Sequence, residues 1–239
     1  MTERIVINPD LKLADYAEQL QSRGRVQIPD FFIPESADYL LRMIQENKDW
    51  YLAYNEGEEY FESSMEQMQA LSPEQRQQFM NSIYARAQTQ FQYVFHQYYI
   101  SQAIQLNEQP GHPMHQVYYF MNDESTLELM RQLTGDASVK KADSYATLYS
   151  PGQFLTQHDD THNKHDRVAA YTFGMTPEWR QNWGGHTAFF DSQGNIEEAF
   201  MPSFNTLNMF LIPQAHAVQM VTPFAGGNRC SYIGWLHRR

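Results

Sequence analysis

Apolar positions in the first half of the chain recur every three or four residues, which is the spacing of amphipathic helices. This pattern predicts a helix over residues 11–21, which Gly24 should end, and a second helix that begins at Pro34. Residues 25–32 lie between the two helices and alternate like a short strand. The apolar residues on the two helical faces are Leu13, Tyr16, Ala17 and Leu20, and then Tyr39, Leu40, Met43 and Ile44.

The next part of the chain contains a segment without a clear pattern, followed by a segment with a strong helix signal. Residues 54–70 are acidic and rich in Glu and Gln without clear periodicity, so we expect a surface excursion there. Ser72 begins a capping box with proline at the first helical position. The apolar spacing after it predicts one long helix that runs to about Ile104 and lies across a sheet.

The pattern changes near residue 138, after a loop over residues 105–114 and a short helix that Gly135 should end. Short alternating segments separated by Pro, Gly and Asn are typical of all-β folds. The predicted strands cover residues 143–149, 153–157, 167–174, 185–190, 195–200, 206–211, 216–221 and 228–237. Eight antiparallel strands in two sheets make a jelly roll, or double-stranded β-helix.

The two halves are expected to form one domain of 239 residues. No repeat, low-complexity tract or linker composition separates residues 1–137 from residues 138–239. The apolar helix faces must be buried, and the outer face of one sheet of the jelly roll is available. The prediction is therefore a mostly β fold in which residues 1–137 provide helical support packed on one sheet of the jelly-roll core.

Composition narrows the class of function. Seventeen basic and 28 acidic side chains give a net charge of −11, which argues against a nucleic-acid partner bound through a basic surface. The single cysteine, Cys230, excludes an internal disulfide framework and fits a reducing compartment. The N-terminus lacks the apolar block of a signal peptide, and no later run is long enough to cross a bilayer. We expect a soluble cytoplasmic protein with no membrane partner.

The candidate chemistry lies around residues 144–160. An imidazole at His158 and a carboxylate at Asp160 are two positions apart, and alternate side chains of an extended segment point to the same side. A second histidine would complete the three-ligand set that leaves open positions on a non-haem iron(II). His216 is the candidate for that third ligand.

A second constellation follows His216 in the last predicted strand. Arg229 and Ser231 alternate with Cys230, so the guanidinium and the hydroxyl should share one face of the strand. An arginine and a serine that converge beside an iron site are suited to holding a carboxylate.

These residues resemble the iron(II)- and 2-oxoglutarate-dependent dioxygenases, specifically the prolyl hydroxylases and, among them, the catalytic domain of the ribosomal-protein prolyl hydroxylases. The resemblance covers about residues 138–237 and, more loosely, the N-terminal third. The positions that carry it are Tyr149, His158, Asp159, Asp160, Arg167, Trp183, Gly184, Gly185, Pro202, Asn205, Leu207, Phe210, His216, Val218, Arg229, Ser231, Gly234 and Trp235.

The resemblance implies a function for each of six positions. It implies that iron(II) is bound by His158, Asp160 and His216, that the far carboxylate of the cosubstrate 2-oxoglutarate is bound by Arg229 and Ser231, and that Tyr149 lines the cosubstrate pocket. It also implies dioxygen as co-reactant and makes ascorbate a candidate auxiliary reductant. Related hydroxylases place a tyrosine that contacts the same carboxylate at the position of Gly174, so this part of the clamp differs here.

Other histidines offer weaker alternatives. A zinc site built from His158, His162 and His165 is conceivable, but solvated side chains in a polar loop explain the last two better. His186 is expected to be a sheet residue near the pocket rather than a ligand.

Three functions remain open at this stage. The leading one is hydroxylation of a prolyl residue in a protein, with a ribosomal or translation protein favoured by the resemblance. The second is hydroxylation of a free amino acid or another small metabolite by the same machinery. The third is a jelly-roll binding or sensing protein without turnover.

Overall fold

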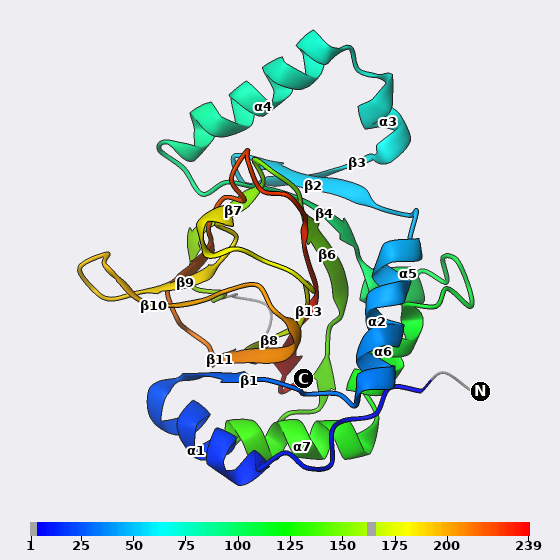
Figure 1. The fold of residues 1–239 in the computed structure, drawn as a ribbon, viewed down its shortest axis with the longest axis vertical. Coiled ribbons are helices and arrows are strands. Elements are labelled where there is room, and N and C mark those ends of the chain that lie inside the picture. The colour runs from blue at the N-terminus through cyan, green and yellow to red at the C-terminus, as the bar shows by residue number, and fades with distance from the viewer. Residues whose placement is uncertain (1–3, 162–165) are drawn as a thin grey trace.

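The computed structural model describes residues 4–161 and 166–239, and its centre is an antiparallel sheet that curls into a nearly closed barrel (Figure 1). Thirteen strands of the described chain join this sheet, in the main order β1-β11-β8-β13-β6-β4-β7-β12-β9-β10. Strand β4 helps to close the barrel because it bridges β6 and β7. One edge of β4 pairs with β7 through Tyr93 and Val94 and with β6 through His96 to Tyr98, and the other edge pairs with β2.

The eight strands predicted for the second half are confirmed. They are β6 (Tyr145–Tyr149), β7 (Phe154–His158), β8 (Arg167–Met175), β9 (Thr187–Phe190), β10 (Ile196–Phe200), β11 (Phe204–Leu211), β12 (His216–Val218) and β13 (Arg229–His237). The two-residue strand β5 (Lys141–Ala142) pairs with the end of β13. A 3-10 turn, η1 (Gln181–Trp183), precedes β9. The jelly-roll prediction is therefore correct.

The first half contributes four strands as well as helices. They are β1 (Arg25–Ile28), β2 (Tyr51–Glu56), β3 (Glu59–Ser64) and β4 (Tyr93–Tyr98). The segment expected to be a surface excursion, residues 54–70, instead contains the end of β2, all of β3 and the short helix α3 (Met65–Ala70). Its acidic side chains did not reveal strands because β3 lies at the edge of the sheet and exposes much of its surface.

The predicted long helix ends earlier than expected. Helix α4 (Pro73–Ala87) has the predicted capping box, but strand β4 and the short helix α5 (Ile100–Gln105) replace its second half. Residues of β4 are buried on both faces, so they show no alternation of buried and exposed positions, and periodicity alone assigns them equally well to a helix. The buried side chain of Gln92 helps to fix this strand, because its amide donates hydrogen bonds to Asn55 of β2.

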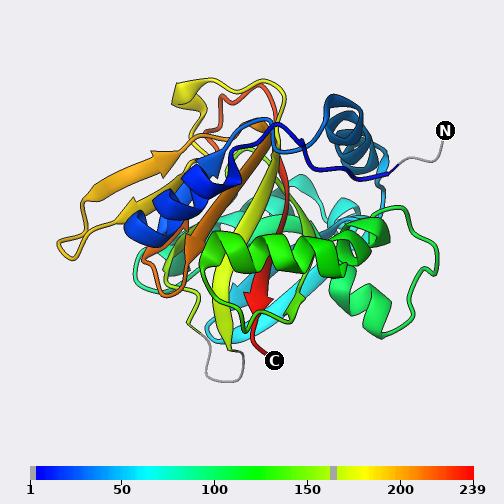
Figure 2. The same cartoon turned by 90° about the horizontal axis from the view of Figure 1, so that it is seen from below.

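Helices cover the outside of the barrel in two groups (Figures 1 and 2). The larger group packs against β1, β5, β8 and β11 and includes α1 (Leu13–Arg23), α2 (Pro34–Glu46), α6 (His115–Met121) and α7 (Glu124–Thr134). Gly24 and Gly135 end α1 and α7 in the left-handed conformation, as predicted. Helix α4 packs instead on β2, β4 and β7, where Ile83 contacts the core. No helix in the described ranges is long and apolar enough to cross a membrane.

Candidate active site

The structure brings His158, Asp160 and His216 together at one end of the barrel interior. His158 ends β7 and His216 begins β12, and the two residues are direct partners in the antiparallel pairing of these strands. Asp160 lies beyond the end of β7 with φ of 62°. Its carboxylate reaches the histidines through this left-handed turn rather than through the strand alternation that we assumed.

The three side chains form a compact cluster, which we call the histidine–aspartate cluster. Nε2 of His158 lies 3.4 Å from Oδ1 of Asp160, and Nε2 of His216 lies 3.5 Å from Oδ2. One potential ligand atom from each residue lies within 4.8 Å of the other two. Two imidazoles and one carboxylate at this separation could hold one metal ion with positions left open.

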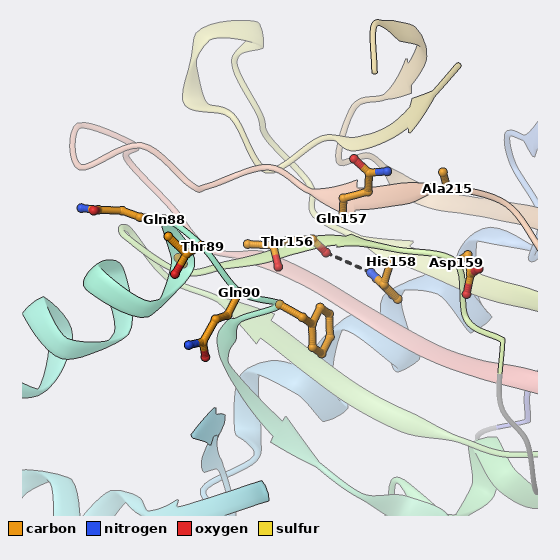
Figure 3. A pocket seen from close by; sticks show the side chains of 10 residues that line it. Gln88, Thr89, Gln90, Thr156, Gln157, His158, Asp159 and Ala215 are labelled. Atoms are coloured by element: carbon orange, nitrogen blue, oxygen red, sulfur yellow. Dashed lines mark hydrogen bonds between the residues drawn. The ribbon is translucent and has the colours of Figure 1, made fainter. Parts of the chain in front are cut away.

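Backbone carbonyls fix both imidazoles. Nδ1 of His158 donates to the carbonyl of Thr156 at 3.0 Å, the contact drawn in Figure 3, and Nδ1 of His216 donates to the carbonyl of Gln214 at 2.8 Å. Because a carbonyl only accepts, the proton of each neutral ring lies on Nδ1 and the lone pair lies on Nε2. Both lone pairs are therefore on the nitrogens that face Asp160, which suits metal ligands.

The electrostatics favour the ligand forms of these groups. Burial acts to raise the pKa of Asp160, but the contacts of its carboxylate with the imidazoles of His158 and His216 outweigh burial and lower the pKa. Burial and repulsion from His158 lower the pKa of His216 to about 4. The carboxylate is thus ionised and His216 is neutral near pH 7.

Arg167 and Trp235 brace the turn that carries Asp160. The guanidinium of Arg167 lies 3.8 Å from the centre of the Trp235 ring and donates to the Asp160 carbonyl at 3.2 Å. Such a stacked cation contributes about 0.5–2 kcal/mol. These two residues therefore hold the left-handed turn at Asp160 from outside the cluster.

A buried cation occupies the opposite end of the interior, which we call the arginine end. Arg229 is only 6% exposed, and its Nη2 donates to the hydroxyl of Thr187 at 3.0 Å. Its Nη1 is buried and has no hydrogen-bond partner among the described residues. A buried guanidinium with an unsatisfied amino group is unfavourable unless an anion pairs with it. The site therefore fits a carboxylate such as the far end of 2-oxoglutarate.

The remaining predicted residues lie beside Arg229. Ser231 hydrogen-bonds to the hydroxyl of Thr147 at 2.9 Å, and the Arg229 guanidinium lies 5.2 Å from the ring centre of Tyr149. One inner cavity is lined by all six residues that the sequence singled out, namely Tyr149, His158, Asp160, His216, Arg229 and Ser231. Trp235 and Phe210 also line it.

Gly174 is explained by its neighbour rather than by an empty space. A Cβ atom at position 174 would lie 2.5 Å from the backbone oxygen of Ser203, so no larger residue fits without movement of the backbone. The hydroxyl of Ser203 lies 3.6 Å from the same point and has no partner among the described residues. A small cavity next to the arginine end is lined by Gly174, Ser203 and Arg229 together with Asn208. Sequence reasoning could not find Ser203, because its approach depends on the register of β11 on β8.

Outside the cluster lies an open groove of about 720 Å³. Figure 3 shows residues of the loop after α4, such as Gln90, and residues of β7, such as His158. Phe91 also lines this groove; it is 46% exposed, and its ring centre lies 5.6 Å from that of His158. The long helix predicted up to about Ile104 included Phe91, so the sequence analysis did not indicate this groove.

The alternative ligands receive no support. His186 does not line the inner cavity, and it lies one residue before β9 rather than within a strand. His162 and His165 lie outside the described residues. Within the described ranges, the histidine–aspartate cluster is the group of side chains with metal-ligand spacing.

Comparison with known proteins agrees with this geometry. Residues 144–237 match the sequence profile of the 2OG-Fe(II) oxygenase superfamily. No curated protein matches the sequence. Similar solved structures include a prolyl-4-hydroxylase from Pseudomonas putida, with 20% identity, a TM-score of 0.59 and coverage of 95% of this chain and 99% of that chain.

Two further structures share the fold. An oxidoreductase of the 2OG-Fe(II) oxygenase family from Burkholderia pseudomallei has 15% identity and a TM-score of 0.62, with coverage of 100% of this chain and 97% of that chain. A prolyl hydroxylase from Trichoplax adhaerens, in complex with a peptide fragment of the hypoxia inducible factor oxygen degradation domain, has 16% identity and a TM-score of 0.61. The match covers 95% of this chain and 90% of that chain.

Proposed function

We propose that this chain, whose residues 144–237 belong to the 2OG-Fe(II) oxygenase superfamily, hydroxylates a prolyl residue of a protein. It is a 2-oxoglutarate-dependent dioxygenase, so Fe(II) is its cofactor and 2-oxoglutarate its cosubstrate. The observation that carries the proposal is the inner cavity, which has a three-ligand cluster at one end and an unsatisfied buried arginine at the other.

In this proposal the two ends of the cavity hold the two reagents. His158, Asp160 and His216 bind Fe(II), Arg229 and Ser231 bind the far carboxylate of 2-oxoglutarate, and Tyr149 lines the pocket between them. When bound, the iron and 2-oxoglutarate supply the oxidation of a substrate C–H bond by dioxygen, with succinate and carbon dioxide as products.

The side chains of the cavity set the conditions for that chemistry. Apolar walls from Leu155, Val218 and Phe210 exclude water and strengthen the charge interactions inside. The carbonyl contacts of the two histidines keep Nε2 of each ring available without a change of tautomer. Arg167 keeps the Asp160 turn in place while the substrate binds.

The open groove beside His158 supports a polypeptide substrate. It lies on the surface next to the cluster, so a chain segment can lie along it while one residue reaches the metal. The exposed ring of Phe91 offers an aromatic surface for a proline at that position. The similar Trichoplax adhaerens structure is a complex with a peptide fragment.

We further propose that the protein substrate is a ribosomal or translation component, so that the enzyme acts in the cytoplasm. The sequence resemblance favours this class. The net charge of −11 suits a basic partner, and attraction of this kind weakens as salt concentration rises.

Succinate release measured with Fe(II), 2-oxoglutarate and candidate substrates tests this function. We expect release to depend on proline-containing peptides and to be absent in His216→Ala. Mass spectrometry of ribosomal proteins from cells with and without the gene should reveal a prolyl hydroxylation that depends on it. Turnover on a free amino acid but on no peptide would replace the proposal with a small-metabolite hydroxylase, and metal and cosubstrate binding without turnover would indicate a sensor.

A further inference from the structure

The edge strand β3 presents a polar and aromatic patch on the inner face of the sheet. The pairing register places Tyr60 opposite Asn55 and Glu62 opposite Ala53 of β2. Ala53 in turn lies opposite Phe95 of β4. Alternation along the strand therefore puts Tyr60 and Glu62 on the same face as the side chains that point into the barrel.

The opposite face of the same hairpin is covered. Leu52 packs with Ile83 of α4, and Tyr54 stacks against Phe61 at 5.5 Å and contacts Phe79 at 4.9 Å. Helix α4 thus buries one face of β2 and β3, whereas Tyr60 on the inner face remains 51% exposed. The contrast marks the inner face as the surface available to a ligand.

A row of aromatic rings connects this patch with the active site. The ring centres of Tyr93 and Phe95 lie 5.6 Å apart, and Phe95 stacks on Tyr149 of the inner cavity at 4.8 Å. On the other side, Tyr93 lies 5.7 Å from Phe91 of the groove beside His158. A polypeptide that occupies the groove can therefore extend over the face that carries Glu62.

Glu62 carries a charge that this chain does not neutralise. Nε2 of Gln97 donates to Oε1 of Glu62 and to the hydroxyl of Tyr60, both at 2.6 Å. Across the described ranges, no lysine or arginine forms an ion pair with Glu62. Burial, followed by the charge of Glu62, raises the pKa of Tyr93 to about 12, so that ring stays neutral near pH 7. The patch combines one carboxylate with neutral tyrosine rings.

This combination selects an organic cation. Calcium and magnesium require several oxygen ligands, and a single carboxylate beside an amide donor does not supply them. A lysine or arginine side chain pairs with the carboxylate and also gains from the faces of tyrosine rings. The net charge of −11 favours approach of a basic segment.

We propose that Glu62, together with Tyr60 and Tyr93, binds a lysine or arginine side chain of the polypeptide substrate, at a position away from the residue that is hydroxylated. The inference rests on the proposed function for its ligand, because it assumes a polypeptide in the groove. It adds a specificity determinant outside the cavity that holds iron and cosubstrate.

The test uses a pool of fluorescent synthetic peptides with a central proline and lysines at varied distances from it, and the same pool with every lysine acetylated. Acetylation removes the charge and keeps the stem. Binding to the full chain is measured by anisotropy, without oxygen and with Fe(II) and 2-oxoglutarate. Glu62→Gln is the variant, and Glu59→Gln is the matched control, because it removes the same charge from the same strand on the other face.

We expect the wild-type protein and Glu59→Gln to prefer the lysine pool by about tenfold, and Glu62→Gln to prefer it by less than about twofold. Thermal melting checks that both variants are folded. A wild-type protein without preference, a preference that survives in Glu62→Gln, or an equal loss in both variants overturns the inference. Preferential binding of the lysine pool without hydroxylation supports the subsite and refutes the proposed function. Hydroxylation of both pools at equal rates supports the proposed function and refutes the subsite.

Discussion

The two ends of the inner cavity reach their arrangement in different ways. In the histidine–aspartate cluster, backbone carbonyls of Thr156 and Gln214 orient both imidazoles so that Nε2 of each ring faces Asp160. At the arginine end, Nη1 of Arg229 is buried without a partner in the described chain. The comparison teaches that local backbone contacts organise the histidine–aspartate cluster, whereas the arginine end keeps a buried donor for a ligand that we propose to be 2-oxoglutarate.

Removal of a metal ligand should have the largest effect. Loss of an outer-shell partner alone lowers metal affinity 10–100-fold, so His216→Ala should weaken Fe(II) binding by at least about 100-fold and abolish turnover. Calorimetric titration with Mn(II) as a stable substitute measures the affinity. Unchanged metal affinity in His216→Ala would show that His216 is not a metal ligand.

Loss of the Arg229 guanidinium should affect the arginine end of the cavity and not the histidine–aspartate cluster. Hydrogen bonds to charged groups contribute about 1.5–3 kcal/mol, so Arg229→Ala should weaken 2-oxoglutarate binding by at least about tenfold, and Ser231→Ala by less. Metal binding should stay the same. Because Arg229 is an unpaired buried cation without ligand, Arg229→Ala should not lower the melting temperature of the ligand-free protein. A large fall in that temperature would show that Arg229 is structural.

Substitution of Gly174 tests the close approach of the Ser203 backbone beside the arginine end. A side chain there meets the Ser203 backbone oxygen, so Gly174→Ala should lower the free energy of unfolding by about 1–3 kcal/mol, and tyrosine should be worse. The structure leaves no room at this position for the tyrosine that related hydroxylases place there. Gly227→Ala is the matched control, because its nearest neighbour would lie 3.9 Å away. Urea denaturation of both variants measures the difference, and equal stability would contradict the close approach.

The smallest effect should come from loss of the contact between Arg167 and Trp235, beside the histidine–aspartate cluster. Trp235→Leu removes the ring beneath the Arg167 guanidinium, an interaction of about 0.5–2 kcal/mol. Metal affinity should fall by about 2–30-fold because the Asp160 turn loses its support. Affinity for 2-oxoglutarate, measured at saturating metal, should change less. A larger loss of affinity for 2-oxoglutarate than for metal would show that Trp235 supports the arginine end rather than the histidine–aspartate cluster.

The sequence predicted the second half of the molecule better than the first for physical reasons. Strands such as β8 and β13 lie between turn residues, and both histidines of the cluster lie at strand ends that the pattern located. Strand β4 was missed because both of its faces are buried, so apolar and polar positions do not alternate along it. Strand β3 was missed because acidic side chains cover this exposed edge of the sheet.

Parts of the site depend on contacts that no pattern along the chain contains. The left-handed turn at Asp160 follows from the packing of Arg167 on Trp235, which are 68 residues apart. The filling of the space at Gly174 depends on a shift of register between β11 and β8 near Phe204. Such features require the assembled barrel, so the sequence indicated which residues take part but not how they meet.

One measurement tests the central claim that the cluster and the arginine end act on one cosubstrate. Binding of 2-oxoglutarate is titrated without oxygen in metal-free and Fe(II)-loaded protein, for the wild type, His216→Ala and Arg229→Ala. We predict one 2-oxoglutarate per chain, with tight binding that requires both the metal and Arg229. Equal affinity in metal-free and Fe(II)-loaded wild-type protein would contradict the account, because it would mean that the two ends do not share a ligand.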